Sequence, residues 1–255
     1  ARSHAMSDSC KVAGLCAFSV FGMLISVSAV SLSAAVACGA FTFAAALTWL
    51  SRSLPAHSPG LWELAPFLAL SPLLFVYVTT PGADAAMYAA IARALGEGRP
   101  ELSAAYPGVH VVMYPRAYPG LIAVLAPSLG MPKACLFAAL LSYVMFVSGL
   151  AFWLRGSVAP RAALALALLL TLAGRNVPLG FFAWGGNPTI MAFGMALTAV
   201  VLVAGAAQAN LFVCSALILA GAFAVHPIGA FGGAACAPIG LLWPRPELRR
   251  VLCVV

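Results

Sequence analysis

The chain has 255 residues, of which 64% are hydrophobic and only 7% are charged. Soluble domains carry charge on roughly 25% of their residues, so this composition excludes an ordinary soluble fold and predicts an integral membrane protein. The formal net charge of +7 does not indicate nucleic-acid binding, because the basic residues stand singly between apolar segments and form no basic stripe with interleaved aromatic side chains.

Apolar segments recur along the whole chain. In lipid, backbone groups must be hydrogen-bonded within the segment, so each such run favours a helix. We therefore expect an all-α bundle of about eight membrane spans, forming one polytopic domain over residues 6–255, because residues 1–5 resemble a cloning remnant. The predicted spans are 12–30, 33–50, 61–79, 134–154, 160–174, 189–206, 211–225 and 228–243.

A ninth apolar piece follows the third predicted span. The run "YPGLIAVLAPSLG" holds about 13 residues, which as a helix would reach roughly 20 Å across a hydrocarbon core of about 30 Å. We interpret residues 117–130 as a re-entrant or interfacial segment, and a full crossing would instead make nine spans.

The basic residues of the short loops predict the orientation. With eight spans and a cytoplasmic N-terminus, all of them face the cytoplasm, as the positive-inside rule requires. They are Lys11, Arg52, Arg155, Arg161, Arg245, Arg249 and Arg250. A ninth span would move Arg155 and Arg161 outside, so the rule disfavours it. The opposite face then receives a loop at 80–133.

The loop at 80–133 opens with an alanine-rich segment, "GADAAMYAAIARALGEG". Its larger apolar side chains recur every four residues, at Met87, Ile91 and Leu95. This spacing predicts a short amphipathic helix that lies along the outer membrane surface and ends at two glycines. Asp84 falls in its first turn, beside Tyr88 on an adjoining face. An acid there can cap the free amides of the helix, or it can serve as a reactive carboxylate.

The order of these segments resembles the first half of a known enzyme family. An apolar span, an Asp opening an alanine-rich helix, "YPRAYPGLIAVLAPSLG" and later "WGGNP" are similar to bacterial or archaeal membrane glycosyltransferases of the GT-C type, over roughly residues 60–240. The resemblance implies sugar transfer from a polyprenyl-phosphate carrier to an acceptor hydroxyl, on the non-cytoplasmic face of the cytoplasmic membrane. In that family an acidic residue of the first large outer loop lies at the reaction centre, and Asp84 matches it.

The chain also departs from that family. Met87 and Tyr88 stand where related sequences often place a histidine, no second outer-face Asp is available, and the family is usually longer, often with a soluble C-terminal domain. The expected partners are therefore the sugar donor, membrane lipids, and either a partner membrane subunit or a C-terminal domain that this chain lacks.

The chemistry assigns roles to the outer-face residues. A carboxylate, Asp84, can accept the proton of the acceptor hydroxyl or hold a divalent cation, while positive groups and hydrogen-bond donors bind the departing phosphate. The candidate substrate-binding residues are Arg116, His110, Tyr88, Arg93, His226 and Asn187. Each has a simpler alternative: Arg93 can meet lipid headgroups, His226 can satisfy a helix end, and Asn187 can form a turn after two glycines.

Two other classes of function stay open from the sequence. A transporter for lipids or small molecules is compatible with the glycine- and proline-containing segment at 226–243, although no acid or base falls in the middle of a predicted span, where ion-coupled transporters usually carry one. A non-catalytic membrane subunit is compatible with the many small residues, which permit close helix packing.

Overall fold

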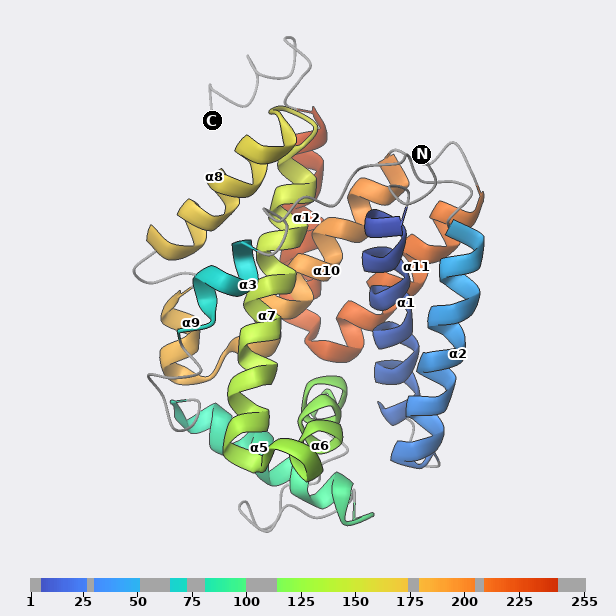
Figure 1. Ribbon diagram of the computed structural model, residues 1–255, viewed down its shortest axis with the longest axis vertical. Coiled ribbons are helices and arrows are strands. Elements are labelled where there is room, and N and C mark those ends of the chain that lie inside the picture. The colour runs from blue at the N-terminus through green and yellow to red at the C-terminus, as the bar shows by residue number, and fades with distance from the viewer. Residues whose placement is uncertain are drawn as a thin grey trace.

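The computed structural model describes residues 6–26, 30–50, 65–72, 81–99, 114–173, 179–204 and 209–242 (Figure 1). Every element of secondary structure in these ranges is a helix, so the predicted all-α class is confirmed. The helices are α1 (Met6–Ser26), α2 (Leu32–Leu50), α3 (Ala65–Leu70), α5 (Ala83–Gly96), α6 (Ala117–Leu129), α7 (Met131–Leu154), α8 (Pro160–Ala173), α9 (Leu179–Trp184), α10 (Asn187–Ala204), α11 (Ala209–Val225) and α12 (Pro227–Leu242).

Four of the helices are long and apolar enough to cross a membrane: α1, α2, α7 and α10. The apolar helices α6, α8, α11 and α12 are shorter, with 13, 14, 17 and 16 residues. A membrane-embedded helical bundle is therefore supported, and within the described residues four helices of spanning length stand against the eight predicted spans.

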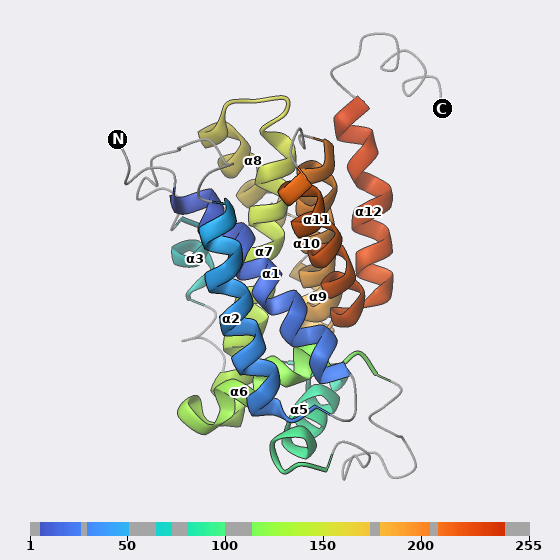
Figure 2. The same ribbon diagram turned by 90° about the vertical axis from the view of Figure 1, so that its right-hand side faces the viewer.

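Helix α10 lies at the centre of the bundle, packed against α7, α11 and α12 (Figures 1 and 2). Small residues allow these helices to approach closely. A Cβ placed on Gly149 of α7 would overlap the Gly194 carbonyl of α10, and one placed on Gly194 would lie 2.6 Å from the Met145 carbonyl oxygen. Large apolar side chains instead face outward, such as Phe41 on α2 and Ile228 on α12, each 76% exposed. Small residues between the helices, with large apolar side chains on the outside, are typical of helices that pack in lipid.

The two ends of the bundle differ in character. The start of α1, the end of α7 and the start of α8 gather at the top of Figure 1, whereas α5 and α6 lie together at the bottom. Helix α6 lies with α5 at the lower end and, at 13 residues, is shorter than a helix that spans the hydrocarbon core. The re-entrant or interfacial placement of residues 117–130 stays a prediction. Helix α5 packs against α6 and also contacts α7 and α9.

Candidate functional site

Helix α5 forms where the alanine-rich periodicity predicts it. Its apolar side turns inward, with Ile91 1% exposed and Leu95 also buried in the main core. The helix ends at Gly96, and beyond it Gly98 has a positive φ of 67° while the Arg99 N–H donates to the Ala94 carbonyl at 2.8 Å. The amphipathic pattern therefore serves to attach α5 to one end of the bundle.

Asp84 lies in the first turn of α5 but does not cap it. The N-cap position belongs to Gly82, and no side-chain cap is formed there. Within the described part of the chain, no hydrogen bond is formed to the Asp84 carboxylate, which is partly exposed. The favourable interaction of an acid with the helix dipole remains. The carboxylate is otherwise available for a ligand.

The segment "WGGNP" is brought directly against Asp84. Gly185, between α9 and α10, has a φ of 93°, which an L side chain rarely adopts. A Cβ at Gly185 would lie 2.6 Å from the Ala85 nitrogen and 3.0 Å from the Asp84 Cβ. Glycine is therefore required here both for the backbone conformation and for the close approach to α5.

His226 lies in the single-residue connection between α11 and α12. Its Nδ1 accepts a hydrogen bond from the Gly229 N–H at 3.3 Å and lies 3.2 Å from the Thr189 hydroxyl of α10. The sequence suggested that His226 satisfies a carbonyl at the end of the preceding helix. Instead, the imidazole satisfies an amide at the start of the following one, because it takes the N-cap position that Ser or Asp usually fills.

Asp84 acts electrostatically on two neighbouring side chains. Burial raises the pKa of Tyr88, and the negative charge of Asp84 raises it further. Burial lowers the pKa of His226, and here the charge of Asp84 opposes the shift by favouring the imidazolium. Asp84 therefore interacts electrostatically both with Tyr88, from the same loop, and with His226 from the far end of the chain.

Three further side chains lie buried at the starts of α6 and α10. Arg116, at the N-cap of α6, is 2% exposed, so its guanidinium is inside the protein and not at the surface. The ring of Tyr118 meets that of Tyr88 edge to face at 5.3 Å, and its hydroxyl is within hydrogen-bonding reach of Asn187. Asn187 is 1% exposed, and its Oδ1 has no hydrogen-bond partner among the described residues. A buried acceptor in this state costs about 1–3 kcal/mol.

The structure does not bring every candidate together. Arg93 is exposed in the last turn of α5, and Arg99 forms an exposed ion pair with Glu97. His110 lies outside the described residues. Sequence reasoning did not include Thr189 or Tyr118 in the site. The repeated Tyr-Pro motif was the available signal for Tyr118, whereas nothing in the sequence distinguished Thr189.

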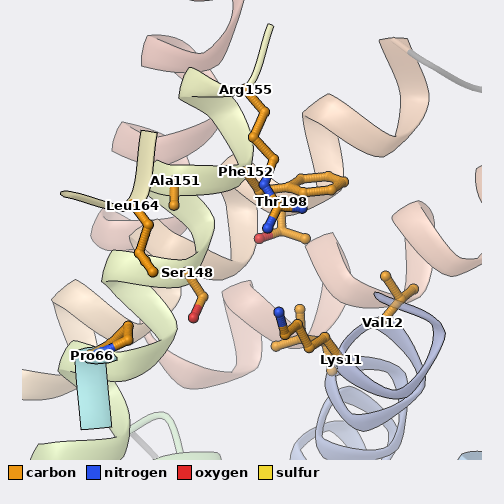
Figure 3. Close-up of a pocket in the computed structure, with 10 residues that line it drawn as sticks. Lys11, Val12, Pro66, Ser148, Ala151, Phe152, Arg155, Leu164 and Thr198 are labelled. Carbon is orange, nitrogen blue, oxygen red and sulfur yellow. The ribbon is translucent and has the colours of Figure 1, made fainter. Parts of the chain in front are cut away.

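A separate small pocket lies at the opposite end of the bundle, with a volume of about 60 Å³ (Figure 3). Lys11 of α1 and Arg155, just after α7, line it together with the hydroxyl-bearing Ser148 and Thr198. Arg155 also stacks over the Phe152 ring at 5.8 Å. Two basic residues predicted to share a side of the membrane therefore lie at the same end of the molecule.

A metal site is not apparent in the described ranges. No group of three or more His, Cys, Asp or Glu side chains gathers there in a way that could hold an ion. Asp84 and His226 would offer only two ligands, and the Nδ1 of His226 is already engaged. Comparison with known proteins gives no match to a family model, a curated protein or a solved structure.

Proposed function

We propose that this chain is a membrane glycosyltransferase that transfers a sugar from a polyprenyl-phosphate carrier to an acceptor hydroxyl. The observation that carries the proposal is that Asp84 and His226 both lie against the start of α10: a Cβ on Gly185 would lie 3.0 Å from the Asp84 Cβ, and the Thr189 hydroxyl lies 3.2 Å from the His226 Nδ1. Asp84 is partly exposed and not engaged by a hydrogen bond within the described residues, so its lone pairs are available to a substrate.

We also propose that the chain crosses the membrane eight times, with its N-terminus in the cytoplasm. The positions of Lys11, Arg155 and Arg161 at one end of the bundle support it, because basic residues favour the cytoplasmic side. The Asp84 site at the other end then faces away from the cytoplasm. Helices shorter than about 20 residues, such as α8, α11 and α12, require a thinned bilayer or continuation by flanking residues in order to cross.

The reaction requires one proton transfer and one displacement. The acceptor oxygen attacks the anomeric carbon of the sugar as the Asp84 carboxylate takes the hydroxyl proton. A new carbon–oxygen bond forms, the bond between the anomeric carbon and the phosphate oxygen breaks, and the polyprenyl phosphate leaves with the electron pair. Since the carboxylate bears the transferred proton at the end of the step, a solvent path from its partly exposed side returns it to the ionised state.

The departing phosphate gains negative charge, which nearby donors and cations stabilise. His226 is positioned for this role at the start of α12, where the partial positive charge of a helix N-terminus adds to the effect. Arg116 is a further candidate for binding the phosphate. Because this residue is 2% exposed, we propose that it acts on the phosphate through its charge and not by direct contact.

The test is turnover of radiolabelled polyprenyl-phosphate sugars by the full chain in nanodiscs. Asp84→Asn removes the charge but keeps the shape of the side chain, and we expect it to abolish transfer while carrier binding persists. Glu97→Gln is the matched control, because it neutralises another acid of the same segment, which is exposed and paired with Arg99. We expect Glu97→Gln to retain wild-type turnover.

Two results would overturn the proposal. If Asp84→Asn transfers sugar at the wild-type rate, Asp84 is not the proton acceptor. If no donor is bound or turned over by the correctly folded wild type, the chain is not a polyprenyl-phosphate glycosyltransferase, and a transporter or a non-catalytic subunit becomes the better interpretation. Circular dichroism and elution as a single species establish the fold of each variant.

A further inference from the structure

An open groove of about 560 Å³ begins beside His226. Its walls come from segments far apart in the chain: Ser26 at the end of α1, Tyr114 and Pro115 before α6, and Phe223, His226 and Ile228 around the α11–α12 connection. His226 lines this groove, and its imidazole is also the group on which the charge of Asp84 acts.

The outer part of the groove is apolar and faces away from the bundle. Phe223 is 42% exposed and Ile228 is 76% exposed. Phe231, one turn further along α12, is 70% exposed. In a membrane-embedded bundle, such a surface contacts hydrocarbon chains. The groove therefore joins a polar end at His226 to a rim that suits a hydrocarbon chain.

The contacts of His226 determine which of its nitrogens carries the proton. A backbone N–H can only donate, so the Nδ1 that receives the Gly229 N–H must be unprotonated. The Thr189 hydroxyl then also donates to Nδ1, at 3.2 Å. A neutral imidazole with an unprotonated Nδ1 carries its proton on Nε2. His226 is therefore held as a neutral hydrogen-bond donor whose Nε2–H is at the far edge of the ring.

The charges around His226 favour an anionic partner for that donor. The amides at the start of α12 contribute partial positive charge, and Tyr114 adds a hydroxyl to the groove. Asp84, on α5, is the acidic group that acts on His226, and its negative charge opposes this preference. A phosphate held by Nε2–H at the head of the groove would have its hydrocarbon chain over Phe223 and Ile228.

We propose that the groove at the α11–α12 connection binds a membrane lipid with a phosphate headgroup, which accepts a hydrogen bond from His226 Nε2–H while its chain lies on the apolar rim. This inference rests on the proposed function, under which the lipid is the sugar carrier, and it adds the place and direction from which the carrier enters. Thr189 is a positioning residue, because it acts on the phosphate only by fixing the ring of His226.

Photo-crosslinking with a diazirine-bearing farnesyl phosphate tests the groove in the full chain. We expect adducts at Tyr114, Phe223 or Ile228, mapped by mass spectrometry. A bulky Ile228→Trp should abolish them. The control Phe212→Trp enlarges an exposed side chain at the opposite end of α11, 59% exposed and outside the groove, and should leave them unchanged.

Competition experiments identify the headgroup. Since a hydrogen bond to a charged group is worth about 10- to 100-fold in affinity, the corresponding alcohol should compete that much more weakly than farnesyl phosphate. Inorganic phosphate should not compete at equal concentration. Effective competition by inorganic phosphate would show a free-phosphate site, and equal competition by the alcohol would show that the headgroup is not recognised. Either result overturns the proposal.

The tautomer is tested independently of any substrate. In chain labelled with ¹⁵N-histidine, we expect the His226 signal, assigned by its loss in His226→Gln, to show a protonated Nε2 and an unprotonated Nδ1. Thr189→Val should weaken this preference. His226→Phe should reduce crosslinking, and His226→Gln, which restores a donor, should recover part of it. A protonated Nδ1 in the wild type would overturn the assignment of the donor.

Failure of this proposal can be told apart from failure of the proposed function. If transfer requires Asp84 but the adducts map elsewhere, the enzyme proposal stands and the groove is not the carrier site. If adducts form in the groove without transfer by any donor, the groove binds a phosphate lipid in a protein that is not a glycosyltransferase.

Discussion

Gly185 and Ala85 approach each other so closely that no side chain fits between them: a Cβ on Gly185 would lie 2.6 Å from the Ala85 nitrogen. Gly185 precedes α10 and Ala85 belongs to the first turn of α5, so this contact joins the central helix of the bundle to the helix that carries Asp84. The geometry of the candidate site depends on this contact, because α5 has few other direct connections to the α9–α10 region.

We predict that Gly185→Ala displaces the start of α5. The residue needs a φ of 93°, and an L residue there costs about 1–3 kcal/mol. The clash with α5 adds a further cost of about 1–3 kcal/mol that is relieved by moving the helix. Hydrogen exchange of the α5 amides should become faster. The rate of sugar transfer should fall by more than the loss of folded protein, measured by thermal unfolding, would explain.

Gly130→Ala is the matched control for Gly185→Ala. Gly130 also has a positive φ, 75°, but a Cβ there would meet nothing within 4 Å. The control should therefore carry the backbone strain without the clash, and should leave α5 exchange unchanged. Equal effects of the two substitutions on α5 would show that the Gly185 contact does not position the helix.

A second prediction concerns the titration of His226. Burial lowers its pKa below the ordinary 6.5, and the charge of Asp84 partly offsets this shift. Asp84→Asn removes the offset, so the midpoint should move further down. NMR titration of ¹⁵N-labelled chain measures it directly. A midpoint that is unchanged or raised in Asp84→Asn would show that the two groups are not coupled.

The same shift predicts how stability depends on pH. A base whose pKa is lower in the folded state binds its proton more readily when unfolded, so its contribution to stability is present above pH 6.5 and is lost as the pH falls through the lower, folded pKa. Wild-type protein should therefore lose more thermal stability on acidification than His226→Gln. Identical pH profiles for the two proteins would contradict this assignment.

A third prediction tests the packing of the central helices. A Cβ on Gly149 would overlap the backbone of Gly194, and overpacking of this kind typically costs about 1–3 kcal/mol or more. Gly149→Ala should lower the midpoint of unfolding in a denaturing-detergent titration. In Gly14→Ala, where a Cβ on α1 meets nothing within 4 Å, helix propensity predicts a neutral or slightly stabilising change of up to about 1 kcal/mol. If Gly149→Ala and Gly14→Ala lowered the unfolding midpoint equally, the close packing of Gly149 against Gly194 would not explain the loss of stability.

The sequence identified elements better than it identified contacts. Periodicity located α5, because Ile91 and Leu95 carry the spacing of a buried helix face. The short apolar run at 117–130 indicated that α6 lies at one end of the bundle. The count of about eight spans stays a prediction, because four of the helices in the described residues reach spanning length while α6, α8, α11 and α12 are shorter. The break between α11 and α12 was predicted, since Pro227 begins α12 and ends α11 at Val225.

The candidate site was predictable only in part. Asp84 and His226 were identified as polar residues of one predicted face, but their electrostatic coupling depends on how α5 and α12 are placed, which no local pattern encodes. Arg116 was identified as a substrate-binding candidate, but no local pattern encodes that it lies inside the protein, where it is 2% exposed. Thr189 became visible only through its contact with the His226 ring.

The orientation of the bundle gives a fourth prediction, which does not depend on catalysis. Arg99, whose side chain is 70% exposed, follows α5, whereas the exposed Arg161 begins α8 at the other end of the molecule. In a background with the seven native cysteines replaced by alanine, Arg99→Cys should react with a membrane-impermeant maleimide on intact spheroplasts. Arg161→Cys should react only after permeabilisation, because the positive-inside rule assigns that end to the cytoplasm.

Each outcome of this labelling constrains the active face differently. The reverse pattern would leave the fold unchanged but turn the Asp84 site toward the cytoplasm, where a soluble nucleotide-sugar donor would be more accessible than a carrier displayed on the outer leaflet. Labelling of both positions in intact cells would place the two ends on the same side, which a bundle with α5 and α8 at opposite ends does not permit. The orientation therefore decides from which side of the membrane the donor reaches Asp84.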